Sequence, residues 1–379
     1  MMSKIWLSPP HLCGEEMKYI QKAFDTNWIA PLGENIDEFE SALKKELGTE
    51  KEVVCLSSGT AALHLSLILA GVSEGDVVVC QSLTFAASAN PIIYQKAIPV
   101  FVDSEKDTYN ISPIYLEKAI KSSMSKGKKP KAIVIVHLYG MPSKIEEIAA
   151  IAKKYDIILI EDGAESLGSS YKGKKCGTFG DFGVLSFNGN KIITTSGGGA
   201  LICKNKTVKD RAIFLATQAK DETTHYQHST IGYNYRMSNI LAGIGRGQME
   251  VLHQYISLRR SNHQFYKNLF QYIDEVQVLE EPCNNFFSNH WLSVITIDEK
   301  QTKFDRESLR IKLLEENIES KPLWKPMHLQ PVFSSYPYYG TTVSESLFEK
   351  GLCLPSGSSL TDTDKERIAN VIKDYFKVV

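Results

Sequence analysis

The segment GDFGVLSFNGNKIITTSGGGALIC (residues 180–203) decides the fold. It predicts two short apolar strands at residues 183–187 and 200–203, joined by a loop that carries Lys191 and a run of three glycines. Strands that are apolar on both faces are typical of a parallel sheet buried between helices. Because ligands of such sheets bind beyond the strand ends, we expect this loop to lie at a ligand site.

Similar apolar runs on both sides of this segment predict an α/β fold. Helical patterns at residues 60–69, 113–122 and 144–154 alternate with these runs, as in a layered α/β domain. We expect a large domain over residues 1–250, with an N-terminal segment at 1–30, and a smaller α+β domain over residues 251–379. The further strands expected are 52–56, 76–80, 98–102, 132–137, 156–160 and 291–297, and the further helices are 239–250, 258–272 and 307–316.

The composition excludes several classes of function. The chain has 379 residues and a formal net charge of −1, so no charge imbalance indicates binding to nucleic acid or to a membrane surface. Seven scattered cysteines without a CxxC pair, and histidines without a ligand cluster, predict reduced thiols and no metal site. The N-terminus has no long apolar run, so we expect no signal peptide and a cytoplasmic location.

Lys191 lies in a polar loop of Asn, Gly and Thr residues, away from any run of charges. Most lysines are surface charges, and taken alone Lys191 could be one of them. A desolvated lysine, however, has a lowered pKa and can form a Schiff base. The glycines at residues 197–199 permit a close approach of the backbone to a ligand.

Ser58, Gly59 and Thr60 form a small turn between a predicted strand and a predicted helix. Backbone N–H groups and the positive end of the helix dipole at such a turn suit a phosphate group. The alternative is an ordinary helix cap, because Ser and Thr begin many helices.

Two acids, Asp162 and Glu165, follow the strand predicted at residues 156–160. Acids at a strand end could bind a metal, act as acid or base, or cap a helix. A buried carboxylate facing a ring nitrogen would keep that nitrogen protonated, because opposite charges favour both ionised forms. Pyridoxal 5′-phosphate (PLP) needs such a partner, because its pyridinium ring is the electron sink.

The loop GYNYRMS (residues 232–238) precedes the helix predicted at 239–250. It is either a capped helix start or a recognition loop for an anionic ligand, with Arg236 as the charge. A phosphate turn, a carboxylate, a Schiff-base lysine and an anion loop, in this order along an α/β domain, together indicate a PLP enzyme.

The block SFNGNKIITTSGGGAL with GYNYRMSNILAGIG resembles the sugar aminotransferases of the DegT/DnrJ/EryC1/StrS group. The resemblance covers nearly the whole chain, from WLSPPHLCGEEMKYIQKAFDTNWIAPLGENIDEFE to KPLWKPMHLQPVF and GLCLPSG. It implies the aspartate-aminotransferase-like fold of PLP enzymes (fold type I). It also implies a reaction in two stages, in which L-glutamate gives its amino group to the cofactor and the cofactor passes it to a sugar ketone.

The resemblance implies roles for single residues. Lys191 would form the Schiff base with PLP and later move the proton between substrate and cofactor. Asp162 would pair with the pyridinium nitrogen. Glu165 falls where the family often has an amide that touches the ring hydroxyl, so its role is open. Ser58, Gly59, Thr60 and Ser186 would hold the phosphate, Phe85 would stack on the ring, and Asn234 would reach the cofactor phosphate of the neighbouring subunit in a homodimer with shared sites.

The phrases SPPH, NWIAPLGE and KPLWKPMHLQ are most similar to enzymes acting on UDP-4-keto-6-deoxy-N-acetylglucosamine. The similarity implies amination at C4″ of a UDP-linked keto sugar, on a route to bacillosamine or legionaminic acid. Trp324 and His328 would lie near the sugar, although both equally suit packing of the small domain. Asn27 and Trp28 would also lie there, and Lys325 and Arg236 are candidates for the diphosphate.

Three other functions fit parts of the pattern. A PLP-dependent sugar dehydratase of this fold has histidine in place of the Schiff-base lysine, and the lysine at position 191 speaks against it. A non-catalytic regulator or scaffold of the same fold would not need Lys191, Asp162 and Ser186 together. An aminotransferase for another keto sugar, such as a GDP- or dTDP-4-keto-6-deoxyhexose or an inositol-type ketone, is separated only by substrate assays.

Overall fold

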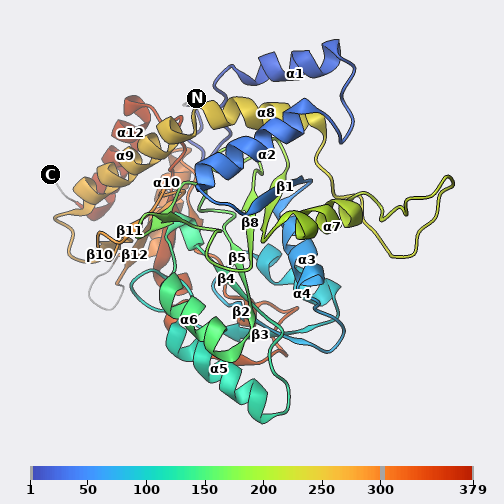
Figure 1. Ribbon diagram of the computed structural model, residues 1–379. Helices are drawn as coiled ribbons and strands as arrows, with labels where there is room; N and C mark the ends of the chain where they lie inside the picture. Colours follow the sequence, from blue (N-terminus) through green and yellow to red (C-terminus); the bar gives the residue numbers. More distant parts are fainter. Residues whose placement is uncertain (1–2, 299–303, 378–379) are drawn as a thin grey trace.

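A computed structural model describes residues 3–298 and 304–377 in two unequal parts (Figure 1). The larger part is built on a mixed sheet of eight strands. β9 is antiparallel to both of its neighbours, and the other neighbouring pairs are parallel. In sheet order the strands are β1 (Glu52–Leu56), β9 (Gly199–Cys203), β8 (Phe182–Ser186), β5 (Ile158–Asp162), β4 (Ala132–Val136), β2 (Val77–Gln81), β3 (Ile98–Val102) and β14 (Tyr338–Tyr339).

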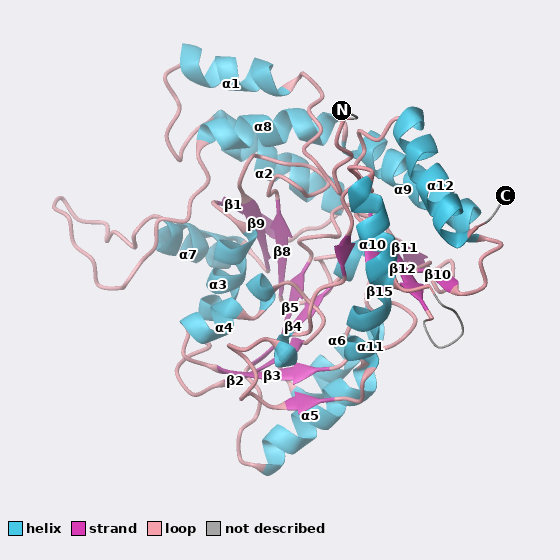
Figure 2. Cartoon of the chain, turned by 180° about the vertical axis from the view of Figure 1, so that it is seen from behind, coloured by secondary structure: helices cyan, strands magenta, loops and turns pink. Residues whose placement is uncertain are grey.

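Helices cover both faces of this sheet, so its strands are buried on both sides (Figure 2). On β4, Val134 packs in the apolar cluster beneath α3 and α7, whereas Ile133 and Ile135 pack against α5 and α6. This alternation follows from the period of two along a strand. The helices of this part are α1 (Glu16–Asp25), α2 (Glu34–Leu47), α3 (Gly59–Leu69), α4 (Asn90–Tyr94), α5 (Pro113–Ser125), α6 (Ile145–Tyr155), α7 (Lys206–Ala216) and α8 (Asn239–Glu250).

The smaller part is an antiparallel sheet of four strands packed against helices. Its strands, in order, are β10 (Val276–Val278), β12 (Ser293–Ile297), β15 (Gly351–Leu354) and β13 (Lys321–Pro322). A third, three-stranded sheet contains β11 (Phe286–Phe287), β6 (Ser170–Tyr171) and β7 (Lys174–Lys175). The helices here are α9 (Leu252–Phe270), α10 (Arg306–Glu315), α11 (Val343–Lys350) and α12 (Asp362–Phe376).

Two segments of the chain cross between the two parts. Ile5 lies in the apolar core of the small part, next to residues of α9, α10 and α12. In the other direction, β14 adds a parallel strand to the edge of the large sheet beside β3. Segments on either side of the boundary predicted between residues 250 and 251 therefore enter both cores, and α9 itself starts inside the large part with Leu252 and Ile256.

The predicted α/β fold is confirmed, and the differences in detail have local causes. The strand predicted at residues 156–160 is Ile158–Asp162, because Asp156 has φ +49° and ends helix α6 in a left-handed conformation. Asp tolerates this conformation better than most residues do. The shift places Glu161 and Asp162 inside the strand rather than after it. The helix predicted from residue 258 begins at Leu252.

Candidate active site

One edge of the large sheet gathers most of the polar residues that the sequence singled out. β1, β2, β5 and β8 end at this edge, and the antiparallel β9 begins there. A cavity opens at this edge, where ligands of such sheets bind. Among the residues that line it are Ser58, Gly59, Thr60, Thr84, Phe85, Ser88, Asp162, Glu165, Ser186, Asn188, Asn190, Lys191, Trp291 and Trp324.

The turn before α3 is held close to its neighbours by contacts that need glycine. Ser58 caps the helix, since its Oγ accepts a hydrogen bond from the N–H of Ala61 at 3.0 Å. A Cβ on Gly199 would lie 2.4 Å from the backbone nitrogen of Gly59, and a Cβ on Gly59 would lie 3.0 Å from the Cβ of Ser186. The N-terminal N–H groups of α3 and the Ser186 side chain therefore face the same end of the cavity, which suits a phosphate.

Asp162 lies at the end of β5 and is 4% exposed. Its Oδ2 accepts a hydrogen bond from the hydroxyl of Ser88 at 2.7 Å, and its Oδ1 accepts one from the N–H of Ala164 at 3.1 Å. Burial raises the pKa of Asp162, although these hydrogen bonds lower it in part. Within residues 3–298 and 304–377 this carboxylate has no ion pair with a cation, so a cationic ligand group would stabilise its charged form.

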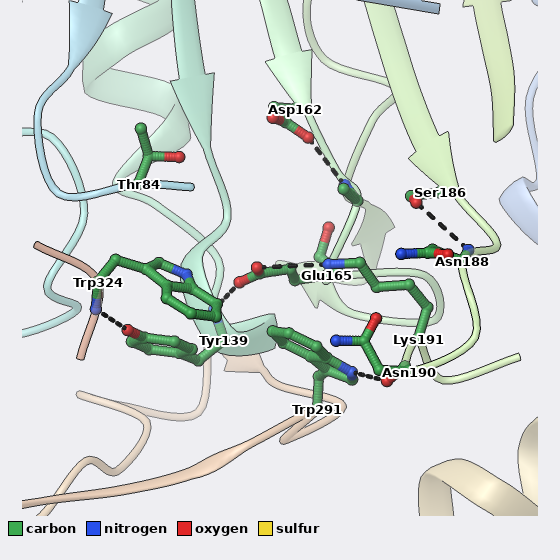
Figure 3. A network of polar contacts seen from close by, with 12 residues as sticks. Thr84, Tyr139, Asp162, Glu165, Ser186, Asn188, Asn190, Lys191, Trp291 and Trp324 are labelled. Atoms are coloured by element: carbon green, nitrogen blue, oxygen red, sulfur yellow. Dashed lines mark hydrogen bonds and ion pairs between the residues drawn. The ribbon is translucent and has the colours of Figure 1, made fainter. Parts of the chain in front are cut away.

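Lys191 follows β8 on a loop that other segments hold in place (Figure 3). Its Nζ lies 3.4 Å from Oε1 of Glu165 and 4.0 Å from the ring centre of Trp291. The next residue back, Asn190, accepts hydrogen bonds at its backbone oxygen from Nε1 of Trp291 and from Oγ of Ser8, both at 2.7 Å. The side chain of Lys191 is 13% exposed, so most of its surface is inside the cavity.

Glu165 lies beside Lys191 and is 4% exposed. Its Oε2 accepts a hydrogen bond of 2.6 Å from the backbone N–H of Tyr139, which lies in a short 3₁₀ segment with φ +56°. Burial raises the pKa of Glu165, whereas Lys191 and the Tyr139 N–H lower it in part. A carboxyl group is therefore held at a fixed position next to the amine of Lys191.

Aromatic side chains close the side of the cavity opposite the strand ends. The backbone N–H of Trp324 donates to the hydroxyl of Tyr139 at 3.0 Å, and the rings of Phe85 and Trp324 are 5.6 Å apart. Asn289 supports a further ring, that of Trp291. Its Oδ1 accepts a hydrogen bond from the backbone N–H of Trp291, while its Nδ2 donates to the backbone oxygen of Glu165. Such faces suit a planar ring or the apolar face of a sugar.

Several predicted site residues lie outside this cavity. Arg236 pairs with Glu40 at 2.6 Å and with the backbone oxygen of Cys55 at 2.9 Å, so its guanidinium is committed within the chain rather than free for an anion. His328 lies between Ser82 and Glu345, 2.7 and 3.1 Å away, and stacks on Tyr338. Its place matches the packing alternative.

The remaining predicted residues are at the surface. Asn234 and Lys325 are exposed. Asn27 has φ +58° and is exposed, and Trp28, 51% exposed, lines a separate hollow with Leu32. None of the four lines the cavity of its own chain.

Sequence reasoning did not single out Trp291, Tyr139 or Ser88. Trp291 was part of a predicted strand, but β12 begins at Ser293, and Trp291 instead contacts the lysine loop. Its partner Asn190 is 101 positions away, and no local pattern reveals such a contact. Ser88 lies in TFAASANP, next to the predicted Phe85, where a hydroxyl among alanines is the only local signal.

A lysine beside one buried carboxylate, in a cavity with a second and with a helix N-terminus, fits the class of PLP-dependent enzymes that use a Schiff base. The chain belongs to the DegT/DnrJ/EryC1/StrS aminotransferase family, whose model matches residues 10–373. It is thus a PLP-dependent sugar aminotransferase.

Similar proteins cover the whole chain. EpsN of Bacillus subtilis (strain 168), named as a pyridoxal phosphate-dependent aminotransferase, is 49% identical over 100% of this chain and 97% of its own. A GDP-perosamine synthase of Escherichia coli O157:H7 is 38% identical over 99% of each chain. The PLP form of Spr1654 from Streptococcus pneumoniae, named as a sugar aminotransferase, has a TM-score of 0.89 at 26% identity over 100% of both chains.

The residues of the cavity fit PLP. Asp162 is a buried carboxylate that lacks a cation, and the pyridinium nitrogen of PLP supplies one. The space beside Gly59 and Gly199, which side chains would fill, lies at the N-terminus of α3 where a phosphate is favoured.

Among the described helices, none combines the length and apolar character needed to span a bilayer.

Proposed function

We propose that the protein transfers the amino group of L-glutamate to C4″ of a nucleotide-linked 4-keto-6-deoxy sugar. The substrate proposed is UDP-2-acetamido-4-keto-2,4,6-trideoxyhexose, and the product is the UDP-4-amino sugar, a precursor for bacillosamine- or legionaminic-acid-type glycans. The observation that carries the proposal is the cavity in which Lys191, Asp162 and the Ser58 turn meet beneath an aromatic wall.

Each side chain of the cavity would have a separate role in the reaction. PLP supplies the electron sink for removal of a proton from the substrate carbon. Lys191 holds the cofactor and then moves that proton, because its Nζ is the mobile base in the cavity. Asp162 keeps the proton on the ring nitrogen. Trp291, Trp324 and Phe85 exclude water, which would otherwise hydrolyse carbon–nitrogen double bonds.

The substrate is tested by direct comparison of nucleotide sugars. Purified protein loaded with PLP is first mixed with L-glutamate, and the visible absorbance of the lysine-bound cofactor is followed as it falls. The UDP-, GDP- and dTDP-linked 4-keto-6-deoxy sugars are then added separately, and the amino sugars are quantified by mass spectrometry. We expect the highest kcat/KM with the UDP-linked 2-acetamido sugar. Equal or higher kcat/KM with a GDP sugar contradicts this choice.

A GDP-linked 4-keto-6-deoxyhexose is the second candidate. The observation that favours it is the 38% identity with a GDP-perosamine synthase over 99% of each chain. The same comparison of sugars decides between the two. Lys191→Ala serves as the control for chemistry, since it should fold yet give no lysine-bound cofactor and no product. If wild-type protein gives no such band with added PLP, a non-catalytic role takes precedence.

We further propose a homodimer in which Asn234 contacts the cofactor phosphate of the neighbouring subunit. What supports it is that Asn234 is exposed and outside the cavity of its own chain. The loop at residues 217–238 also carries the exposed Tyr226 and Ile231. Mixing Asn234→Ala with Lys191→Ala chains should restore about a quarter to a half of the activity if sites are shared, since mixed dimers then hold one intact site. No recovery in verified mixed dimers contradicts a shared site.

A further inference from the structure

One lysine and two acids lie together in the cavity, and only one of the acids touches the lysine. Oε1 of Glu165 is 3.4 Å from Nζ of Lys191, whereas Asp162 accepts its hydrogen bonds from Ser88 and Ala164. An amide in place of this carboxylate could accept a hydrogen bond, but it could not take a proton from an ammonium, because an amide is too weak a base.

The state of Lys191 decides whether it can act as a base. An ammonium has no lone pair, so Lys191 in its protonated form must lose that proton before it can take one from a substrate. This applies when the amino group is already on the cofactor and Lys191 is free, because a lysine displaced from a Schiff base by a substrate amine leaves as the neutral amine. Burial disfavours an ammonium and a carboxylate alike, since both lose hydration, whereas an amine beside a carboxylic acid carries no charge. The 4% exposure of Glu165 and the 13% exposure of the Lys191 side chain place the pair in such surroundings.

Titratable groups from several elements surround Glu165. Lys191 faces it from the loop after β8, Asp162 from β5, Tyr139 from the segment after β4, and Cys353 from β15. Of these, only Lys191 brings a cation within hydrogen-bond distance of the carboxyl group. The burial that raises the pKa of Glu165 makes this carboxylate a better proton acceptor than an exposed one.

We propose that Glu165 accepts the proton of the free Lys191 ammonium before the second stage of the reaction, when the amino group is on the cofactor. The N–H bond at Nζ breaks, an O–H bond forms at Oε1, and the pair passes from ammonium plus carboxylate to amine plus carboxylic acid. No other reactant is needed, and the net charge of the pair stays zero. The reverse transfer restores the ammonium when Lys191 is next free. This inference rests on the proposed role of Lys191.

The proposal and its alternative, in which Glu165 only stabilises the ammonium, predict opposite shifts of the pH profile when Glu165 is replaced. If the pair shares one proton, the fraction of neutral lysine is independent of pH over a wide range, and replacing Glu165 by Gln forces Lys191 to release its proton to water. The acid limb of the rate then moves to higher pH. If Glu165 merely stabilises the ammonium, its loss makes Lys191 easier to deprotonate, and the acid limb moves to lower pH.

The test compares wild-type holoenzyme with Glu165→Gln and Glu165→Asp. The cofactor is first given its amino group by L-glutamate, the excess is removed, and the rate of the reaction with 2-oxoglutarate is measured against pH by stopped-flow absorbance, because Lys191 is free at the start of this stage. Wild type should stay level on the acid side where the Gln variant loses about tenfold per pH unit, because one titrating group then controls the rate. The Asp variant keeps a proton acceptor and should restore the level profile. An acid limb that moves down, or does not move, in the Gln variant overturns the proposal.

A spectroscopic readout separates this inference from the function itself. The pH titration of the lysine-bound cofactor band in the Gln variant should show that Lys191 still holds the cofactor, since the amide oxygen still accepts from the Tyr139 N–H. Absence of that band in wild type would remove the proposed role of Lys191 altogether. If only the Gln variant fails to bind cofactor, the Asp profile decides, and a steep acid limb there counts against the proposal.

Discussion

The floor of the cavity and the loop at residues 217–238 are built in opposite ways. The floor, defined here by Ser58, Asp162, Ser186 and Lys191, comes from strand ends that the large sheet holds in place. The loop between α7 and α8 instead extends away from the body of the chain in both views (Figures 1 and 2). Its hydrogen bonds gather on Asp221, which accepts from Ser229 and Gln227.

The floor and the loop differ in how far contacts within one chain cover their side chains. Contacts within the same chain hold the floor residues in place, as the hydrogen bond from Ser88 holds Asp162. The loop carries Tyr226 and Ile231 at 84% and 83% exposure. Isolated exposed apolar side chains are common, but two on one projecting loop are consistent with the partner surface proposed above. Changes in the floor should therefore impair chemistry, and changes in the loop should act through assembly or stability.

The largest expected effect is that of Asp162→Asn in the floor. The amide keeps the shape and accepts from Ser88, but it does not hold a proton on the ring nitrogen. The rate of the L-glutamate half-reaction should fall by about 10²-fold or more, as when one preorganised electrostatic group is removed. PLP should still bind. A half-reaction within about threefold of wild type by stopped-flow absorbance would contradict the pairing of Asp162 with the cofactor.

A smaller effect is expected from Gly199→Ala, which tests how closely the floor is packed. The new Cβ would lie 2.4 Å from the backbone nitrogen of Gly59, so the backbone must move. Overpacking of this kind costs about 1–3 kcal/mol, or roughly 5- to 150-fold in PLP affinity if the moved turn binds the phosphate. The matched control is Gly197→Ala, where a Cβ would meet nothing within 4 Å.

Equilibrium binding of PLP, followed by absorbance, separates the two glycine variants. Equal affinities for both would show that the close approach of β9 to the turn before α3 has no bearing on the phosphate. A loss confined to the Gly197 variant would place the phosphate nearer to the glycine run than to Gly59.

The same contrast explains what the sequence could predict. The strands at residues 52–56 and 98–102 were predicted to the residue, because short apolar runs between turns leave little choice of boundary. Asp162, Glu165 and Lys191 were predicted to share a site, since parallel strands bring their carboxyl ends to one edge. Trp291 and the commitment of Arg236 to Glu40 were not predicted. These contacts join residues 101 and 196 positions apart, and only the packed chain sets them.

Arg236 joins the base of the loop to α2 and β1 and should have the smallest effect on chemistry. Its guanidinium pairs with Glu40 of α2, which Lys209 also contacts at 2.8 Å. The backbone of Arg236 forms an antiparallel β-bridge with Leu56 of β1. Arg236→Met leaves Glu40 with one cation instead of two. We expect a loss of about 1–3 kcal/mol in the free energy of unfolding, typical of hydrogen bonds to charged groups.

A double-mutant cycle with Glu40→Gln distinguishes the ion pair from a ligand contact. If the pair is the role of Arg236, the two changes together should cost less than the sum of the single changes, and the KM for the nucleotide sugar should stay within about twofold of wild type. A KM raised by about tenfold with unchanged stability would instead assign the guanidinium to the diphosphate. Because Arg236 lies at the base of the loop, that outcome would also make the loop part of the substrate site rather than a separate region.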